Sequence, residues 1–133
     1  MPFSRAARRL FLALLLAAPA GPARAAGPAQ VPSGGQVVLG TYYEVAGPDC
    51  RALSAPRVRI TSAGSLGKAI VVRTTGQAAA TARCRHRQVP VAMVLYQADK
   101  PGLDSVAWEV RYQQRGTPLE HGAADVRVMP RRP

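Results

Sequence analysis

The sequence is poor in several kinds of residue, and each shortage narrows what the chain can do. Only 5% of its 133 residues are aromatic, although 47% are hydrophobic, so we expect one domain with a modest core. Its 7 acidic residues are scattered singly and offer no paired carboxylates for glycoside hydrolysis. Neither histidine, His86 or His121, has a nucleophile and an orienting carboxylate beside it in the sequence. We therefore expect no catalytic residues and no enzyme.

Cysteine is equally scarce, with only Cys50 and Cys84 in the chain. The two are 34 residues apart and belong to no CxxC pair, so they lack the ligand spacing of a zinc site. We predict no metal and no cofactor. An even pair of cysteines in an oxidising compartment is most simply a disulfide, and we predict that these two form one.

The first 25 residues indicate such a compartment. Basic Arg5, Arg8 and Arg9 precede an apolar run from Leu10 to Ala18, and a small-x-small cleavage site follows at Ala23 to Ala25. This pattern predicts a secretory signal peptide over residues 1–25. The apolar run has about half of the roughly 20 residues that a membrane span needs. We therefore expect no membrane span after cleavage and a periplasmic or secreted protein.

The export route has two interpretations. The segment from Arg8 to Leu12, Arg-Arg-Leu-Phe-Leu, is similar to the core of a twin-arginine signal. However, Ala7 and Ala13 stand where a polar residue and a lysine are usual in that pattern. General secretory export and twin-arginine export both remain open.

The rest of the chain contains no convincing amphipathic helix. It contains short β-branched runs separated by Gly and Pro, at the spacing typical of a sandwich or barrel. Residues 26–35 lack periodicity and predict a flexible lead-in, and residues 130–133 predict a basic tail. We predict an all-β domain over residues 36–129 with seven strands, at residues 36–45, 57–62, 68–74, 81–87, 91–96, 105–113 and 123–129.

Basic residues are what the chain has in excess, with 18 Lys and Arg and a net charge of +11. Arg83, Arg85 and Arg87 alternate with Cys84 along one predicted strand. Because alternate residues of a strand share a face, these three arginines are expected to point outward together. They are the candidate anion-binding residues.

Other arginines can enlarge this surface. If Arg57, Arg59 or Arg73 lies on a neighbouring strand, the outer face becomes a guanidinium patch suited to phosphate or carboxylate groups. The alternative is ordinary solvated surface. A nucleic-acid partner is not expected, because no aromatic residues are interleaved with the basic strand to stack on bases. The expected partner is an envelope protein or an acidic polymer.

One stretch of the sequence carries a family resemblance. Tyr96 closes a predicted strand, Pro101 lies in the following loop, and Gly102-x-Asp104 opens a strand that contains Trp108. Cys50 precedes an early predicted strand, Cys84 follows it, and a Val-rich strand ends the domain. Over residues 49–129 this order of features resembles the small bacterial immunoglobulin-like or cadherin-like domains. Val106 stands where an aromatic residue is usual. The resemblance implies a single immunoglobulin-like β-sandwich.

The Gly102-x-Asp104 step has a structural and a functional interpretation. Gly102 can take a positive φ, and the Asp104 carboxylate can accept backbone N–H bonds from the turn that it follows. The resemblance to cadherin-like domains raises calcium as the alternative. Calcium needs six to eight oxygen ligands, and the chain has no DxD pattern. We therefore predict a turn motif and no metal.

Together these features predict an exported, non-catalytic binding or structural module of the bacterial cell envelope. The alternative is a small periplasmic inhibitor or enzyme accessory protein, whose loops fill a partner's cleft. The fold cannot choose between them, because one fold supports many functions.

Overall fold

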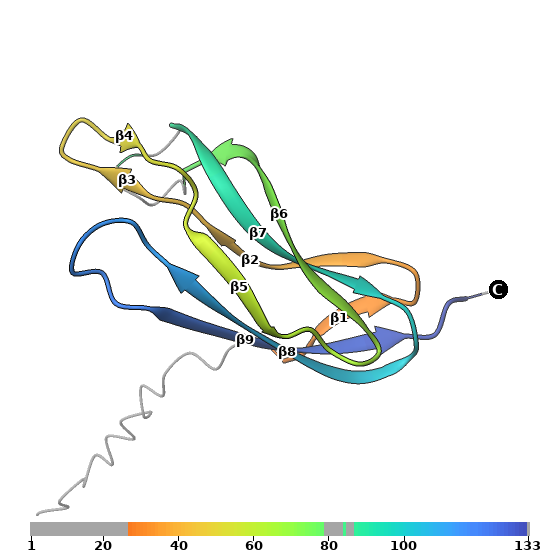
Figure 1. Cartoon of the computed structure of the whole chain (residues 1–133). Coiled ribbons are helices and arrows are strands. Elements are labelled where there is room, and N and C mark those ends of the chain that lie inside the picture. The colour runs from red at the N-terminus through yellow and green to blue at the C-terminus, as the bar shows by residue number, and fades with distance from the viewer. Residues whose placement is uncertain (1–26, 79–83, 85–86, 133) are drawn as a thin grey trace, which may run out of the picture.

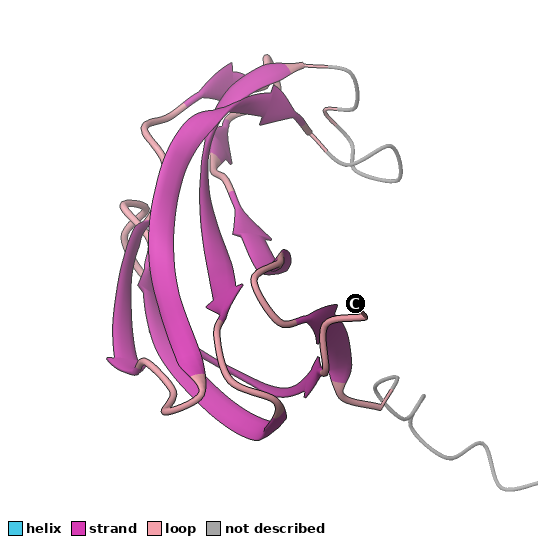
Figure 2. Ribbon diagram, turned by 90° about the vertical axis from the view of Figure 1, so that its right-hand side faces the viewer, coloured by secondary structure: helices cyan, strands magenta, loops and turns pink. Residues whose placement is uncertain are grey.

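The regular structure of the chain is built of strands. A computed structural model describes residues 27–78, 84 and 87–132, and no helix that could cross a membrane occurs among them. Figures 1 and 2 show the long strands curving together along their length. The strands are β1 (Ala29–Pro32), β2 (Gln36–Tyr42), β3 (Val45–Ala46), β4 (Arg51–Ala52), β5 (Arg57–Ser62), β6 (Gly67–Gln77), β7 (Gln88–Ala98), β8 (Gly102–Arg111) and β9 (Glu120–Met129).

The strands form two principal sheets that pack together, as the all-β prediction requires. One sheet has the order β1-β9-β8-β5 and the other has the order β2-β7-β6, while β3 and β4 pair separately. Strand β1 runs parallel to β9, and the other pairs are antiparallel. Strands β5 and β6 are therefore edge strands of different sheets, joined by the connection at residues 63–66.

The core lies between the two sheets and consists mainly of valine. Burial alternates along β8, where Val106, Trp108 and Val110 are buried, because successive side chains of a strand point to opposite faces. The Trp108 Nε1 donates a hydrogen bond of 2.7 Å to the Tyr42 hydroxyl. The buried cluster contains Val31, Ala69, Val94, Tyr96, Ala98, Val106, Trp108, Val110, Val126 and Val128.

Strand β1 corrects the prediction of a flexible lead-in over residues 26–35. Ala29 to Pro32 pairs with β9, and Val31 is only 2% exposed. The Ser33 N–H donates to the Met129 carbonyl at 2.8 Å, which holds the turn after β1 against the end of β9. Four residues are too few for an alternating pattern to predict a strand. The burial of β1 depends instead on its pairing with β9, almost a hundred residues later in the sequence.

Strands β6 and β7 are longer than the predicted strands at residues 68–74 and 91–96. These strands pair over their full length, from Gly67 opposite Ala98 to Gln77 opposite Gln88. β7 therefore contains Pro90, which usually argues against a central strand. Pro90 lies beyond the last β2 pair, Tyr42–Ala92, so at that point β7 pairs only with β6 among the described strands.

Most of the strand predicted at residues 81–87 lies outside the described residues. Cys84 lies in a turn and Arg87 precedes β7, so neither of these two described residues is in a strand. The predicted disulfide is confirmed between Cys50 and Cys84, whose Cα atoms are 5.6 Å apart. It joins Cys50, in the turn between β3 and β4, to Cys84, which lies between β6 and β7 in the sequence.

Candidate functional site

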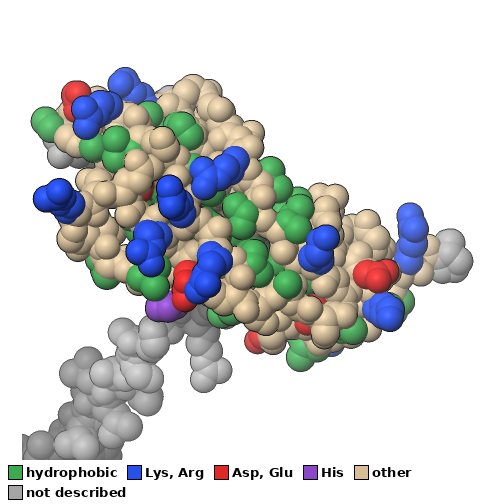
Figure 3. Space-filling view, viewed as in Figure 1, with side chains coloured by type: hydrophobic (Ala, Val, Ile, Leu, Met, Phe, Trp, Pro, Cys, Tyr) green, Lys and Arg blue, Asp and Glu red, His purple; other side chains and the backbone are tan. Residues whose placement is uncertain are grey.

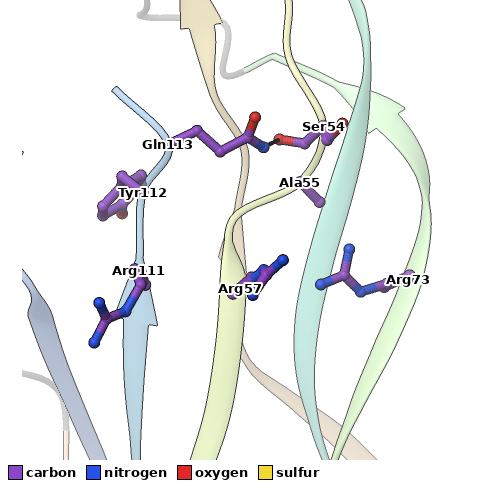
Figure 4. A pocket seen from close by; sticks show the side chains of 7 residues that line it. All are labelled: Ser54, Ala55, Arg57, Arg73, Arg111, Tyr112 and Gln113. Atoms are coloured by element: carbon purple, nitrogen blue, oxygen red, sulfur yellow. Dashed lines mark hydrogen bonds between the residues drawn. The ribbon is translucent and has the colours of Figure 1, made fainter. Parts of the chain in front are cut away.

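The seam between edge strands β5 and β6 contains the candidate site. A hollow of about 530 Å³ opens there, within the size range of small-molecule sites. We call this hollow the seam pocket. It is lined by Ser54, Ala55, Arg57, Arg73, Arg111, Tyr112 and Gln113, which Figure 4 shows as sticks.

Three arginines from three strands meet at the seam pocket. Arg57 begins β5 and lies directly opposite Arg111, the last residue of β8. Arg73 comes from β6, in the other sheet. Figure 4 shows the Arg73 side chain directed toward Arg57, whereas Arg111 turns to the other side. The sandwich thus brings the side chains of Arg57 and Arg73 toward each other, although the two residues are distant in the sequence.

The three arginines of the seam pocket have no counterion among the described residues. Arg59 is different, because its Nη2 lies 2.9 Å from the Glu109 carboxylate. A second hollow, of about 520 Å³, adjoins this ion pair and shares Arg57 and Arg111 with the seam pocket. We call Arg57, Arg59, Arg73 and Arg111 the arginine face, and Figure 3 shows blue side chains gathered over β5 and β8 with little red among them.

The rim of the seam pocket is held by hydrogen bonds between separate loops. The Gln113 side-chain amide donates to the Ser54 carbonyl at 2.8 Å. The Gln113 backbone N–H donates at 2.6 Å to Glu44, a carboxylate that is only 3% exposed. The Leu53 N–H donates to the Glu44 carbonyl at 3.0 Å. These bonds fix the segment before β5 to the segment after β8, and so position Arg57 beside Arg111.

Tyr112 adds no negative charge to the pocket. Its hydroxyl donates a hydrogen bond to the Glu120 carboxylate. Burial and this hydrogen bond raise the pKa of Tyr112 well above its ordinary value, so the phenol stays protonated. The charge of the residues lining the seam pocket is therefore that of its three arginines.

Of the three predicted anion-binding residues, the structure describes only Arg87. Arg83 and Arg85 lie outside the described residues, and Arg87 is exposed but does not line the seam pocket. The suggested neighbours Arg57 and Arg73 do come together, and Arg111 joins them. Sequence analysis missed Arg111, although the alternation of β8 puts it on the outward face with Glu109.

Asp104 has a larger structural role than the predicted local turn. Its carboxylate accepts hydrogen bonds from the Ser65 N–H at 3.0 Å and the Leu66 N–H at 2.9 Å, 39 and 38 residues away in the sequence. It also accepts one from the Tyr96 hydroxyl at 2.6 Å and one from the Ser105 N–H at 2.9 Å. Asp104 therefore fastens the β5–β6 connection to β8, while Gly102 has the expected positive φ of 137°.

The hydrogen bonds decide the ionisation of Asp104. Burial alone would raise the pKa of this carboxyl group, but the donors Tyr96, Ser65, Leu66 and Ser105 lower its pKa below the ordinary value. Gly64 makes the approach possible, because a Cβ there would lie 2.5 Å from the carboxylate. Protein donors thus occupy the carboxylate, and no group of three potential metal-binding side chains is found among the described residues.

Comparisons of the chain with known protein families, with curated proteins and with solved structures find no match. Its function must therefore be inferred from the chemistry of the described residues.

Proposed function

We propose that this chain is an exported, non-catalytic binding module of the bacterial cell envelope, which holds an acidic polymer or an acidic partner on its arginine face. The supporting observation is that Arg57, Arg73 and Arg111 gather at one pocket without a counterion among the described residues. Like charges placed together destabilise a free protein, and an anionic ligand removes that repulsion. Envelope polymers carry the phosphate and carboxylate groups that guanidinium forks bind.

The chemistry of the pocket favours binding over catalysis. No Asp, Glu, His or Cys is among the described residues that line it. Arginine stays protonated and cannot act as a general base, and Tyr112 is held as a neutral phenol by its raised pKa. The lining residues can therefore attract and orient an anion, but they offer no group for proton transfer.

The strand order supports an immunoglobulin-like assignment. Seven strands have four or more residues; lettered A to G in chain order, they give the neighbours B-E-D and C-F-G. These are the neighbours of the immunoglobulin sandwich. Two features depart from that pattern. Strand A pairs with G in place of B, and the disulfide joins the B–C and D–E connections instead of strands B and F.

Export is proposed from residues 1–25 and agrees with the disulfide. A stable disulfide is typical of an oxidising compartment such as the periplasm or the extracellular medium. Intact-mass measurement of the exported protein should give a chain that starts at Ala26. A membrane-bound product that retains Leu10 to Ala18 would contradict this proposal.

Binding to immobilised polyphosphate and polygalacturonate tests the proposed function. The exported protein should bind, with affinity falling steeply between about 50 and 500 mM salt, because salt screens exposed charges. Replacing Arg57, Arg59 and Arg111 by Gln should weaken binding about tenfold, at roughly 0.5 kcal/mol for each exposed contact. The matched control replaces the exposed Arg127, Arg131 and Arg132, which removes the same charge outside the pocket.

The comparison of the two variants shows whether binding depends on where the positive charges lie or only on their number. A loss confined to the arginine-face variant supports the proposal. Equal losses in the two variants, or binding that ignores salt, would show that the face is ordinary solvated surface.

The inhibitor alternative has one observation in its favour. The disulfide of Cys50 holds the β3–β4 hairpin in place, and Cys50 itself has a positive φ of 56°. A rigid loop loses little conformational freedom on entering a partner's cleft. Capture of an envelope partner that survives the arginine-face substitutions but is lost on reduction of the disulfide would favour this alternative.

A further inference from the structure

Arg73 differs from the other residues of the arginine face in the side of the sheet that it occupies. It lies on β6 opposite Ala92, which is fully buried, and four residues after Ala69, which belongs to the core. Residues two and four apart on a strand share one face. Arg73 therefore stands on the side of β6 that is turned toward the other sheet, and its guanidinium group reaches the seam beside Arg57 (Figure 4).

The Arg73 side chain is exposed, although it stands on the core-facing side of β6. What sets it apart is its neighbour, because like charges placed close together are destabilising. Arg73 has no hydrogen bond or ion pair with any residue that the structure describes. The group that faces it across the seam is a second guanidinium, that of Arg57. An anion bound between these two guanidinium groups can pair with both of them and offset their repulsion.

The number of charges indicates which anion fits. Arg57 and Arg73 bring two positive charges to the pocket and Arg111 adds a third at its edge. The other lining residues, Ser54, Ala55, Tyr112 and Gln113, bring no negative charge. Guanidinium forks bind phosphate oxygens in a bidentate manner. A phosphomonoester carries close to two negative charges at neutral pH and three exposed oxygens, whereas a carboxylate or a phosphodiester carries one charge.

We propose that the seam pocket is a specific site for the phosphate group of a phosphomonoester, held between Arg57 and Arg73 with Arg111 at its edge. This inference rests on the proposed function, because it names the chemical group that the arginine face takes. The pocket volume of about 530 Å³ leaves room for part of the organic group that carries the phosphate. That group is either a soluble metabolite or a lipid.

The backbone on both sides of the pocket is held in place by burial and hydrogen bonds. Arg57 follows Ala55 and Pro56, both buried, and the hydrogen bond from Gln113 to Ser54 closes the rim. Arg73 lies within the paired β6–β7 ladder, opposite Ala92. The backbone positions of Arg57 and Arg73 are therefore fixed before a ligand binds, which reduces the conformational freedom lost on binding.

Calorimetric titration of the exported protein with three small anions tests the inference. Glycerol 3-phosphate should bind at least about tenfold more tightly than dimethyl phosphate or acetate, because only the monoester offers two charges to three arginines. Arg73→Gln should weaken glycerol 3-phosphate binding about tenfold or more, and Arg127→Gln, with the same loss of charge outside the pocket, should leave it unchanged. If Arg73→Gln fails to fold, Arg73→Lys should fold and still lose affinity, because it keeps the charge but removes the fork.

Vesicles separate the two sources of the phosphate. Binding to phosphatidylcholine vesicles that contain phosphatidic acid, lost in Arg73→Gln, assigns a lipid ligand. Binding of glycerol 3-phosphate with no vesicle binding assigns a soluble ligand.

Equal affinity for the three anions, or equal losses in Arg73→Gln and Arg127→Gln, would overturn the inference. The proposed function would survive that result if the Arg57, Arg59 and Arg111 substitutions still weakened salt-sensitive polymer binding about tenfold. The two claims can therefore fail separately.

Discussion

Arg57 and Arg111 lie directly opposite each other on β5 and β8, and neither has a counterion among the described residues. Two positions along the same ladder, Arg59 lies opposite Glu109 and forms an ion pair of 2.9 Å. Opposite charges across a strand pair are stabilising and like charges are destabilising. The same two strands thus hold one compensated and one uncompensated pair, and the uncompensated pair lines the seam pocket.

The Asp104 network should be a major contributor to stability. Asp104→Asn should reduce the free energy of unfolding by about 2 to 4 kcal/mol. The new amide NH₂ group is itself a donor, so some of the groups that now donate to the carboxylate would lose their acceptor. Asp125→Asn is the matched control, since Asp125 is exposed and accepts from Ser105 Oγ at 2.9 Å. Its effect should stay within about 0.5 kcal/mol. Urea unfolding measures both, and similar losses in the two variants would contradict the assigned role.

The same network predicts how stability depends on pH. The folded-state pKa of Asp104 is lowered, so its contribution is present above its ordinary pKa, near 3.9, and is lost as pH falls through and below that value. Burial and Asp104 raise the pKa of Tyr96, so its contribution is present below its ordinary pKa, near 10, and is lost only at higher pH.

Between about pH 5 and pH 9 neither group should alter stability. Unfolding measured from pH 7 to pH 3 should show a smaller acid loss in Asp104→Asn than in the unmodified chain. An acid loss of the same size in both would show that Asp104 is not the group responsible.

The packing of the single tryptophan gives another test. A Cβ at Gly122 would lie 2.2 Å from Trp108 Nε1, so Gly122→Ala should displace the indole and destabilise the chain by about 1 to 3 kcal/mol. The displaced indole should also lose its bond to Tyr42 and shift its fluorescence emission. Gly76→Ala is the control, since a Cβ there would meet Val91 at 3.4 Å, an ordinary contact. A normal emission spectrum in Gly122→Ala would contradict this packing.

The disulfide should supply a large part of the stability of the domain. It closes a loop across a sequence separation of 34 residues, which is worth about 3 to 4 kcal/mol on the chain-entropy estimate. Cys50→Ala with Cys84→Ala should lower the free energy of unfolding by about that amount, measured in urea. An unchanged midpoint would show that the β3–β4 hairpin is held by its other contacts.

The strand composition was predictable because alternation and β-branching are local properties. Val106, Trp108 and Val110 are buried as the pattern of β8 indicates, and an even cysteine pair was enough to predict Cys50–Cys84. Strand β1 could not be predicted, because its burial depends on pairing with β9. The hydrogen bonds from Ser65 and Leu66 to Asp104 could not be predicted either, because these residues are remote from Asp104 in the sequence and lie beside it only in the folded chain.

The candidate site also depends on contacts between residues that are remote in the sequence. Alternate spacing along one strand is a local pattern, and it predicted Arg83, Arg85 and Arg87 as the anion-binding residues. The site that the structure describes joins Arg57, Arg73 and Arg111 from three strands and both sheets. Their proximity depends on register and on how the sheets pack, which no local spacing encodes.

The variant Arg111→Gln tests whether the arginine face is an anion-binding surface, if its thermal stability and its polymer binding are both measured at low salt. Arg111 is exposed and opposes Arg57 without a counterion among the described residues, so its removal should relieve a repulsion of about 0.2 to 1 kcal/mol. The melting temperature should then rise by about 1 to 5 °C, while binding to polyphosphate weakens. A melting temperature that falls, or polymer binding that stays unchanged, would show that Arg111 is not part of an anion-binding surface.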